Sequence, residues 1–297
     1  MATRVETPYT RRARYYSSHE AFNITHSAIP AHVFVAERDR ALDPATPTGL
    51  IACDLSAELH AAGPVTTPLI LARYARIRAG ERLATRFAAT GELYYVIAGE
   101  GETRAGADRI AWEAGDIVCL PGGGEHVHQT GSRDAVLWVI TNEPELAFAA
   151  TRPPAAETSP VEPVHYPADE IRQGLARIHA LPAELTSTGK ALVFTSAAMD
   201  TPKTVLPSLT LAMNSLLPTE MQRPHLHNSV AVTLPVQGER CYSMIGGRRV
   251  PWQQWATMIT PPGEMHSHHN DGDALAMFLI VQDGGLHYYT RTMGFSY

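Results

Sequence analysis

The chain has 297 residues, of which 44% are hydrophobic, and a formal net charge of −6 at neutral pH. This length accommodates two modest domains, each with its own core. The negative charge argues against the basic face of a nucleic-acid-binding protein, and no apolar run is long enough to predict a membrane span. The start of the chain has no apolar signal core, so we expect a cytoplasmic protein without nucleic-acid or membrane partners. Three scattered cysteines, Cys53, Cys119 and Cys241, are typical of reduced thiols.

The first half of the chain begins with an irregular segment, which is followed by short predicted strands. Residues 1–64 mix aromatic, polar and proline-containing stretches, and we expect an N-terminal arm that packs on a domain or on a second subunit. Short apolar or alternating runs follow at 71–77, 94–97 and 136–140, separated by glycine turns. Many short strands without intervening helices predict an all-β sandwich or barrel over residues 65–145.

A proline-rich segment separates this unit from a second one. Residues 146–190 have the composition of a linker, and residues 168–178 within it predict a short helix with an apolar stripe. Strand-like runs then resume at 192–194, 209–213, 230–234, 257–259 and 276–281. The second unit, residues 191–297, is therefore expected to repeat the architecture of the first.

Three histidines of the second unit have the spacing of a metal site. His225 and His227 stand two apart in a segment with β character, so their side chains emerge on one face. His266 follows a Pro-Gly turn and completes a set of three nitrogens. Three neutral imidazoles on one side of a divalent metal leave the other side open to substrate and dioxygen. Iron(II) is the expected metal, although zinc, manganese, nickel and copper also accept imidazole.

Two further side chains share the direction of these histidines. Arg223 has the parity of His225, and its guanidinium suits a substrate carboxylate; the alternative is a salt bridge at the rim. His268 has the parity of His266, and we consider it an alternative ligand, an acid–base group beside the metal, or a hydrogen-bonded loop histidine. We predict catalytic roles for both, Arg223 to position a carboxylate and His268 to handle a proton.

These motifs resemble those of the cupin family. The segment Pro261-x-Gly263-x-x-His266-x-x-x-Asn270 resembles the core of the second cupin motif, and His225-x-His227 resembles the centre of the first, with Gly238 as its closing glycine. The acidic ligand position of the first motif, around Ala231 and Val232, is apolar. A three-histidine set without the glutamate resembles the site of gentisate-type cupin dioxygenases.

The first unit resembles the same frame with its ligands replaced. Gly80, Gly99, Gly115, Pro121, Gly123 and His126 match the motifs, and Glu92 is retained, but Arg86 and Ala88 stand where two histidines belong. The resemblance therefore implies a bicupin, with two cupin (jelly-roll) β-barrels in tandem and a degenerate, metal-free first barrel. We expect a buried Arg86–Glu92 pair in that barrel and His128 at its surface.

The resemblance also implies a reaction class. It implies an oxidoreductase, a non-haem iron(II) dioxygenase that uses O2 on a small hydroxylated aromatic or related carboxylate and forms a homo-oligomer. In gentisate 1,2-dioxygenases the iron sits in the amino-terminal cupin, whereas the histidine set here is in the carboxy-terminal one, so the substrate stays open. Two alternatives remain: a lyase, isomerase or decarboxylase that uses the metal as a Lewis acid, and a non-catalytic cupin that binds a small molecule.

Overall fold

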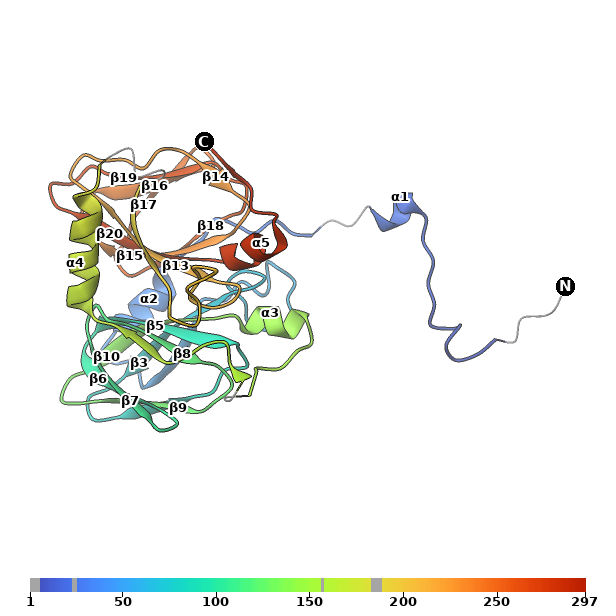
Figure 1. Ribbon diagram of the computed structural model, residues 1–297, viewed down its shortest axis with the longest axis horizontal. Helices are drawn as coiled ribbons and strands as arrows, with labels where there is room; N and C mark the ends of the chain where they lie inside the picture. Colours follow the sequence, from blue (N-terminus) through green and yellow to red (C-terminus); the bar gives the residue numbers. More distant parts are fainter. Residues whose placement is uncertain (1–5, 23–25, 156–157, 183–188) are drawn as a thin grey trace.

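A computed structural model describes residues 6–22, 26–155, 158–182 and 189–297. Residues 1–5 and 23–25 of the predicted arm, and 156–157 and 183–188 of the predicted linker, lie outside the described residues. Figure 1 shows two β-barrels side by side, with the carboxy-terminal barrel in orange and red and the amino-terminal one in green and cyan. The expected all-β tandem of jelly-roll barrels, with an arm and a partly helical linker, is confirmed.

Each barrel consists of one large sheet and one or two smaller sheets. In the first barrel the large sheet has the order β11-β8-β5-β10-β3-β2 and the small sheet the order β4-β9-β6-β7. The strand bounds are β2 Gly49–Ala52, β3 Leu71–Ile77, β4 Arg82–Thr85, β5 Gly91–Ala98, β6 Glu100–Ala105, β7 Asp108–Glu113, β8 Ile117–Pro121, β9 His126–Thr130, β10 Ala135–Thr141 and β11 Val164–Tyr166.

The second barrel repeats this plan. Its large sheet has the order β1-β18-β15-β20-β13-β12, and two small sheets, β17-β16-β19 and β14-β21, lie opposite. The strand bounds are β1 Val33–Phe34, β12 Lys190–Phe194, β13 Thr210–Leu216, β14 Leu226–His227, β15 Ala231–Gln237, β16 Cys241–Ile245, β17 Arg248–Pro251, β18 Thr257–Thr260, β19 His266–Asn270, β20 Ala276–Gln282 and β21 Phe295–Ser296.

The two large sheets share one hydrophobic core between the barrels. Because side chains alternate along a strand, Leu279 and Val281 of β20 face this core, together with Leu93 and Trp138 of the first barrel. Gln282 lies on the opposite face of β20, inside the second barrel. The shared core therefore fixes which residues of the second large sheet point into that barrel.

The interior of the first barrel is filled. Tyr94 and Trp112 lie among its buried apolar side chains, and the Tyr94 hydroxyl donates to Glu92 Oε2. Glu92 is fully buried and also contacts His126 Nδ1 at 3.0 Å, whereas Arg86 is exposed. The expected Arg86–Glu92 pair is therefore wrong, because a histidine and a tyrosine already satisfy Glu92 Oε2. The expected surface position of His128 is also wrong, since His128 is only 1% exposed.

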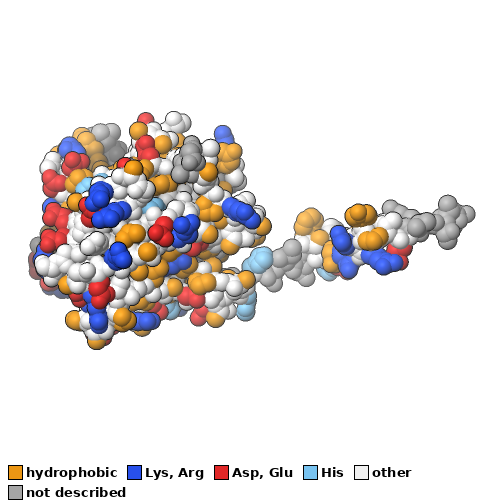
Figure 2. All heavy atoms as spheres, turned by 90° about the horizontal axis from the view of Figure 1, so that it is seen from below, with side chains coloured by type: hydrophobic (Ala, Val, Ile, Leu, Met, Phe, Trp, Pro, Cys, Tyr) orange, Lys and Arg blue, Asp and Glu red, His pale blue; other side chains and the backbone are white. Residues whose placement is uncertain are grey.

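The segments outside the barrels are an extended arm and the connections between the two barrels. Residues 6–22, with α1 (Ser18–Ala21), extend away from the body (Figures 1 and 2). Further along, β1 pairs with β18 of the second barrel, α2 (Val35–Leu42) follows, and β2 pairs with β3 of the first barrel. After the first barrel come α3 (Glu143–Phe148) and α4 (Ala168–His179), the predicted helix, which packs Gly174 against Leu192 of β12. The last helix is α5 (Gly284–Thr290).

Within the described ranges, no helix has both the length and the apolar character needed to span a membrane. All three cysteines are buried and free.

Candidate metal centre

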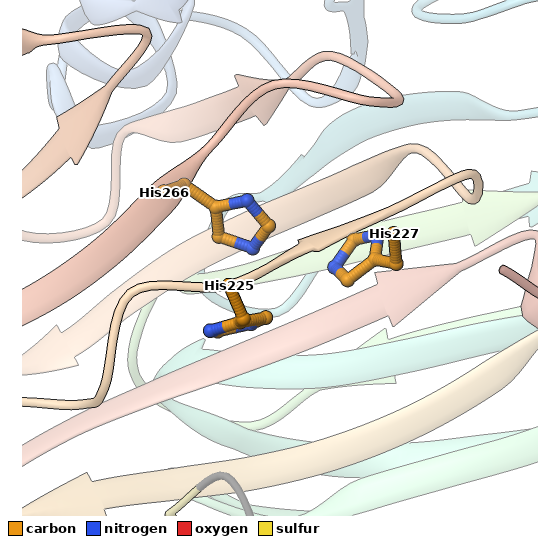
Figure 3. Close-up of side chains that lie close together, drawn as sticks. All are labelled: His225, His227 and His266. Atoms are coloured by element: carbon orange, nitrogen blue, oxygen red, sulfur yellow. The ribbon is translucent and has the colours of Figure 1, made fainter. Parts of the chain in front are cut away.

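Two segments bring the three predicted histidines together. His225 and His266 form an antiparallel bridge, in which each backbone N–H donates to the other's carbonyl at 2.9 and 2.8 Å. His227 follows on the same side, and its carbonyl accepts from Gly263, whose φ of +75° a residue with a side chain rarely adopts. The turn before His266 is thereby fixed to the strand that carries His227. Figure 3 shows the three rings grouped together.

The ring nitrogens converge within reach of a single ion. One nitrogen from each of His225, His227 and His266 lies within 4.8 Å of the other two, and all three residues are buried. The ring centroids of His266 lie 4.3 Å from His225 and 4.7 Å from His227. Metal–imidazole bonds of about 2 Å are compatible with this spacing.

The surrounding backbone sets the tautomer of each ring. The Nδ1 atoms of His225, His227 and His266 each lie 2.8 Å from a carbonyl, of Arg223, Ser229 and Glu264 respectively. A carbonyl can only accept, so each Nδ1 carries the proton and donates it. Each Nε2 is left with a lone pair, the form in which imidazole binds a metal. The residues present therefore fit a divalent metal.

Burial keeps these rings neutral. Loss of hydration lowers the pKa of His225 and His227, and it lowers the pKa of His266 to about 3. Neighbouring imidazoles lower the pKa of His266 further, against the hydrogen bond to Glu264. At neutral pH the lone pairs are therefore not lost to protons, and no proton has to leave before a metal binds.

The histidines form one wall of a cavity of about 680 Å³ inside the second barrel. The cavity has apolar walls, from residues such as Leu211 and Ile280, and a few polar side chains: Asn214, Gln222, Ser229, His268 and Gln282. Phe295 of the last strand stacks on His225 with its centroid 5.3 Å away. A space of this size, with convergent polar groups, is typical of a small-molecule site.

His268 lines the same cavity but has a different hydrogen-bond pattern. Its Nδ1 lies 2.8 Å from Ser243 Oγ, which accepts from the indole N–H of Trp252 at 2.9 Å. The Ser243 hydroxyl thus connects the Trp252 indole to the His268 ring and holds its Nδ1 in place. His268 is held by a side-chain hydroxyl, whereas the three clustered histidines are held by backbone carbonyls. Burial also lowers its pKa well below the usual value.

The first barrel contains the same chain of contacts. Trp112 Nε1 donates to Thr103 Oγ1 at 2.9 Å, and Thr103 Oγ1 lies 2.8 Å from His128 Nδ1. We name these three-residue chains the tryptophan relays, Trp252–Ser243–His268 and Trp112–Thr103–His128. Because the relay also occurs in the barrel with a filled interior, it does not depend on a cavity.

Arg223 lies apart from the cavity. Its side chain is exposed, and its guanidinium carbon lies 3.9 Å from the centroid of the Tyr297 ring. Only its carbonyl contributes to the site, as the acceptor for His225 Nδ1. The charged side chain among the described cavity residues is instead Lys203, a position that the sequence pattern did not identify.

Gln282 is a second cavity residue that the sequence pattern missed. Its Nε2 lies 3.0 Å from His227 Nε2. It stands at the end of the apolar run 276–281, far from both histidine motifs. Only the strand pairing places it beside them.

Comparison with known proteins supports the fold and the resemblance. No family model matches the sequence. A gentisate 1,2-dioxygenase from Ralstonia sp. is 28% identical over 144 residues, 48% of this chain and 41% of that relative. A 5-aminosalicylate 1,2-dioxygenase from Comamonas sp. is 33% identical over 100 residues, 31% of this chain and 26% of the relative. The matched part thus spans less than half the length of these relatives.

Solved structures match over the whole chain. A salicylate 1,2-dioxygenase from Pseudaminobacter salicylatoxidans has a TM-score of 0.77 at 12% identity, covering 98% of this chain and 93% of that one. An adduct of that enzyme with gentisate gives 0.76, covering 99% and 95%. An oxalate decarboxylase gives 0.54 at 14% identity, covering 86% and 75%. Identities this low support the fold alone. In fold and in its motifs, the chain is a bicupin that resembles the gentisate 1,2-dioxygenase-like ring-cleaving dioxygenases.

Proposed function

We propose that this protein is a metal-dependent dioxygenase that acts on a small hydroxylated aromatic or related carboxylate. The observation that carries the proposal is the convergence of three neutral imidazoles, each with its proton on Nδ1, on one wall of a cavity inside the second barrel. The names of the curated relatives, all aromatic-ring 1,2-dioxygenases, support the reaction class.

Iron(II), held by His225, His227 and His266, is the proposed metal. Bound there, it would supply coordination of the substrate and of dioxygen together, and electron transfer between them. Zinc, manganese, nickel and copper suit the same donors, so the donor set alone supports a divalent metal rather than iron in particular.

The chain's own residues would bind and shield the substrate. The apolar walls suit an aromatic ring, and Phe295 covers the histidines from one side. His268 lines the cavity wall beside the histidine cluster, so we propose that it holds a proton near the reacting oxygen. The predicted role of Arg223 in binding a carboxylate would require its side chain to leave the ring of Tyr297.

We propose different roles for the two barrels. Residues 191–297 would carry the metal site, and residues 65–145 would form a scaffold without one, joined by a linker over 146–190. The arm, residues 1–64, supports a homo-oligomer, since its exposed aromatic side chains at 9, 15, 16 and 22 suit contact with another copy. A cytoplasmic location completes the proposal.

An oxygen electrode tests the reaction. Iron-loaded protein is mixed with hydroxylated benzoates and naphthoates, among them gentisate, salicylate and 1-hydroxy-2-naphthoate. We expect one of them to be consumed together with an equal amount of O2, and its aromatic absorbance to disappear. Equal turnover without oxygen, or with zinc in place of iron, would instead favour a lyase, isomerase or decarboxylase.

A further inference from the structure

The neighbouring strand fills the position at which the cupin pattern lacks an acid. Ala231 stands where the acidic ligand is expected, and its methyl group lines the cavity. Gln282 of β20 is paired with Ala231 on one side and with Thr210 of β13 on the other. Opposed residues of antiparallel strands point to the same face, with Cβ atoms about 5 Å apart. The side chain of Gln282 therefore occupies the space that a long acid at position 231 would use.

Gln282 contacts the atom that a metal would bind. Since His227 Nδ1 donates to Ser229, His227 Nε2 is an acceptor, and the amide N–H of Gln282 donates to it across 3.0 Å. One lone pair cannot serve both this amide and a metal ion. Metal binding would thus release the amide of Gln282 at the open side of the histidine cluster. No described residue donates a hydrogen bond to its Oε1, so the amide is not held elsewhere.

The neutral amide of Gln282 matters because the cavity contains few charged side chains. Among the described residues that line the cavity there is no aspartate or glutamate, and the one lysine is Lys203, whose Nζ lies 2.6 Å from Asp200. Three neutral imidazoles and a neutral amide leave the charge of a divalent metal uncompensated. An acid at the same place would cancel part of that charge and repel an anionic substrate.

We propose that Gln282 stands in for the missing acidic ligand as a positioning residue: it caps His227 Nε2 before the metal binds, and then donates its N–H to an oxygen of an anionic substrate. This role rests on the proposed function and narrows its substrates to anions that offer two oxygens, such as a phenol next to a carboxylate. The neutral amide gives up metal affinity and gains affinity for such anions.

Cobalt(II) is a probe whose binding does not require turnover. Competition with a chelator gives the cobalt dissociation constant, and the visible spectrum of the cobalt protein reports titration with gentisate in the absence of oxygen. Gln282→Glu supplies the acid, and Gln282→Leu removes the amide at similar volume. Gln129→Glu, on the exposed face of β9 in the first barrel, is the matched control for charge.

The proposal gives each variant a distinct result. Gln282→Glu should bind cobalt at least about tenfold more tightly and gentisate at least about tenfold more weakly than the wild type. Gln282→Leu should bind cobalt no more weakly than the wild type and gentisate about tenfold more weakly. Gln129→Glu should match the wild type in both.

The outcomes separate this role from the reaction. If both Gln282 variants bind cobalt and gentisate within twofold of the wild type, the role of Gln282 is wrong, whatever the oxygen electrode records. If the variants differ as expected but no substrate consumes oxygen, the role holds and the dioxygenase proposal is wrong. A wild-type protein that binds no cobalt overturns both.

Discussion

The indole N–H of Trp138 on β10 donates a hydrogen bond to Thr257 Oγ1 on β18, 2.9 Å away in the core between the two barrels. The hydroxyl of Tyr74 lies 2.9 Å from the same oxygen and donates to the carbonyl of Trp255 at 2.6 Å. Residues of the first barrel thus bind β18 of the second through polar contacts inside apolar surroundings. Such contacts define one relative orientation of the two large sheets, because any other leaves buried donors unpaired.

We expect Thr257→Val to destabilise the whole protein. The substitution keeps the shape but leaves the buried N–H of Trp138 unpaired, at a cost of about 1–3 kcal/mol. Thr260 lies on the same strand, and its buried hydroxyl has no hydrogen-bond partner among the described residues. Thr260→Val is therefore the matched control and should be neutral or stabilising. Urea unfolding measures both; equal losses would show that the hydrogen bond contributes nothing.

Removal of one clustered imidazole should weaken metal binding. His225→Ala leaves two of the three nitrogens, so we expect at least about tenfold weaker metal binding. A ligand that binds only the folded state raises the melting temperature. Added cobalt should therefore raise the melting temperature of the wild type and not that of His225→Ala. His269→Gln, which replaces a ring stacked on Tyr242 outside the cavity, should still respond.

The two tryptophan relays provide a matched test of His268. Ser243→Ala removes the hydroxyl that holds His268 Nδ1, so we expect turnover to fall at least about tenfold while the metal stays bound. Thr103→Val makes the equivalent change in the first barrel. Both variants should lose about 1–3 kcal/mol of stability, because each leaves an indole N–H unpaired. A similar loss of turnover in both would assign the effect of Ser243 to folding alone.

Acid should destabilise the protein through His128. Burial lowers its pKa in the folded state to about 3, whereas the ordinary value is 6.5. Near pH 6.5, His128 therefore takes up a proton in the unfolded chain but not in the folded protein. The free energy of unfolding falls as the pH drops from 6.5 towards 3. Between pH 6.5 and 5 this amounts to roughly 2 kcal/mol, at about 1.4 kcal/mol per pH unit.

Substitution isolates this contribution. Urea unfolding of metal-free protein at pH 6.5 and pH 5 should show a smaller loss for His128→Gln than for the wild type. His19→Gln, at an exposed position of α1, is the control and should lose as much as the wild type. An unchanged loss in His128→Gln would show that His128 takes up its proton in the folded protein as readily as in the unfolded chain.

The arm offers a test of assembly. Tyr9, Tyr15, Tyr16 and Phe22 are exposed, and the hydrogen bonds of the described residues 6–22 all lie within that segment. If these rings contact another copy, a Tyr15→Ser, Tyr16→Ser, Phe22→Ser variant should have a lower mass by light scattering than the wild type. Arg11→Ser with Arg12→Ser should not. Equal masses would leave the arm without a part in assembly.

Much of the fold was predictable from the sequence because its strands are apolar and buried. The runs at 71–77, 136–140 and 276–281 fall on β3, β10 and β20, each packed in the interior of the molecule. The strands β16 and β17 and the helix α2 were not predicted. In β16, Ser243 interrupts a short apolar stretch; β17 begins with two exposed arginines; and α2 buries only Ala41. No long apolar run or clear periodicity therefore marks these elements.

The candidate site was predictable where short motifs carry it. His225, His227 and His266 come together as the spacing predicts, because His225 pairs with His266 and the turn at Gly263 donates to the His227 carbonyl. Arg223 has the right parity on an extended strand, yet its guanidinium stacks on Tyr297 instead. The parity argument fails there because the regular strand includes only Leu226 and His227, so position 223 does not continue its pleat. The division into an arm, two barrels and a linker at the stated boundaries stays a prediction.

The pairing of Ala231 with Gln282 means that the chemistry of this pocket can be rewritten from either of two adjoining strands. A carboxylate could be introduced at Ala231, restoring the usual order of the motif, or at Gln282, leaving the motif untouched. A sequence search limited to the histidine motif would find no acid at Ala231 and would overlook Gln282 on the neighbouring strand. Either Ala231 or Gln282 can therefore be substituted to change the charge beside the same three histidines.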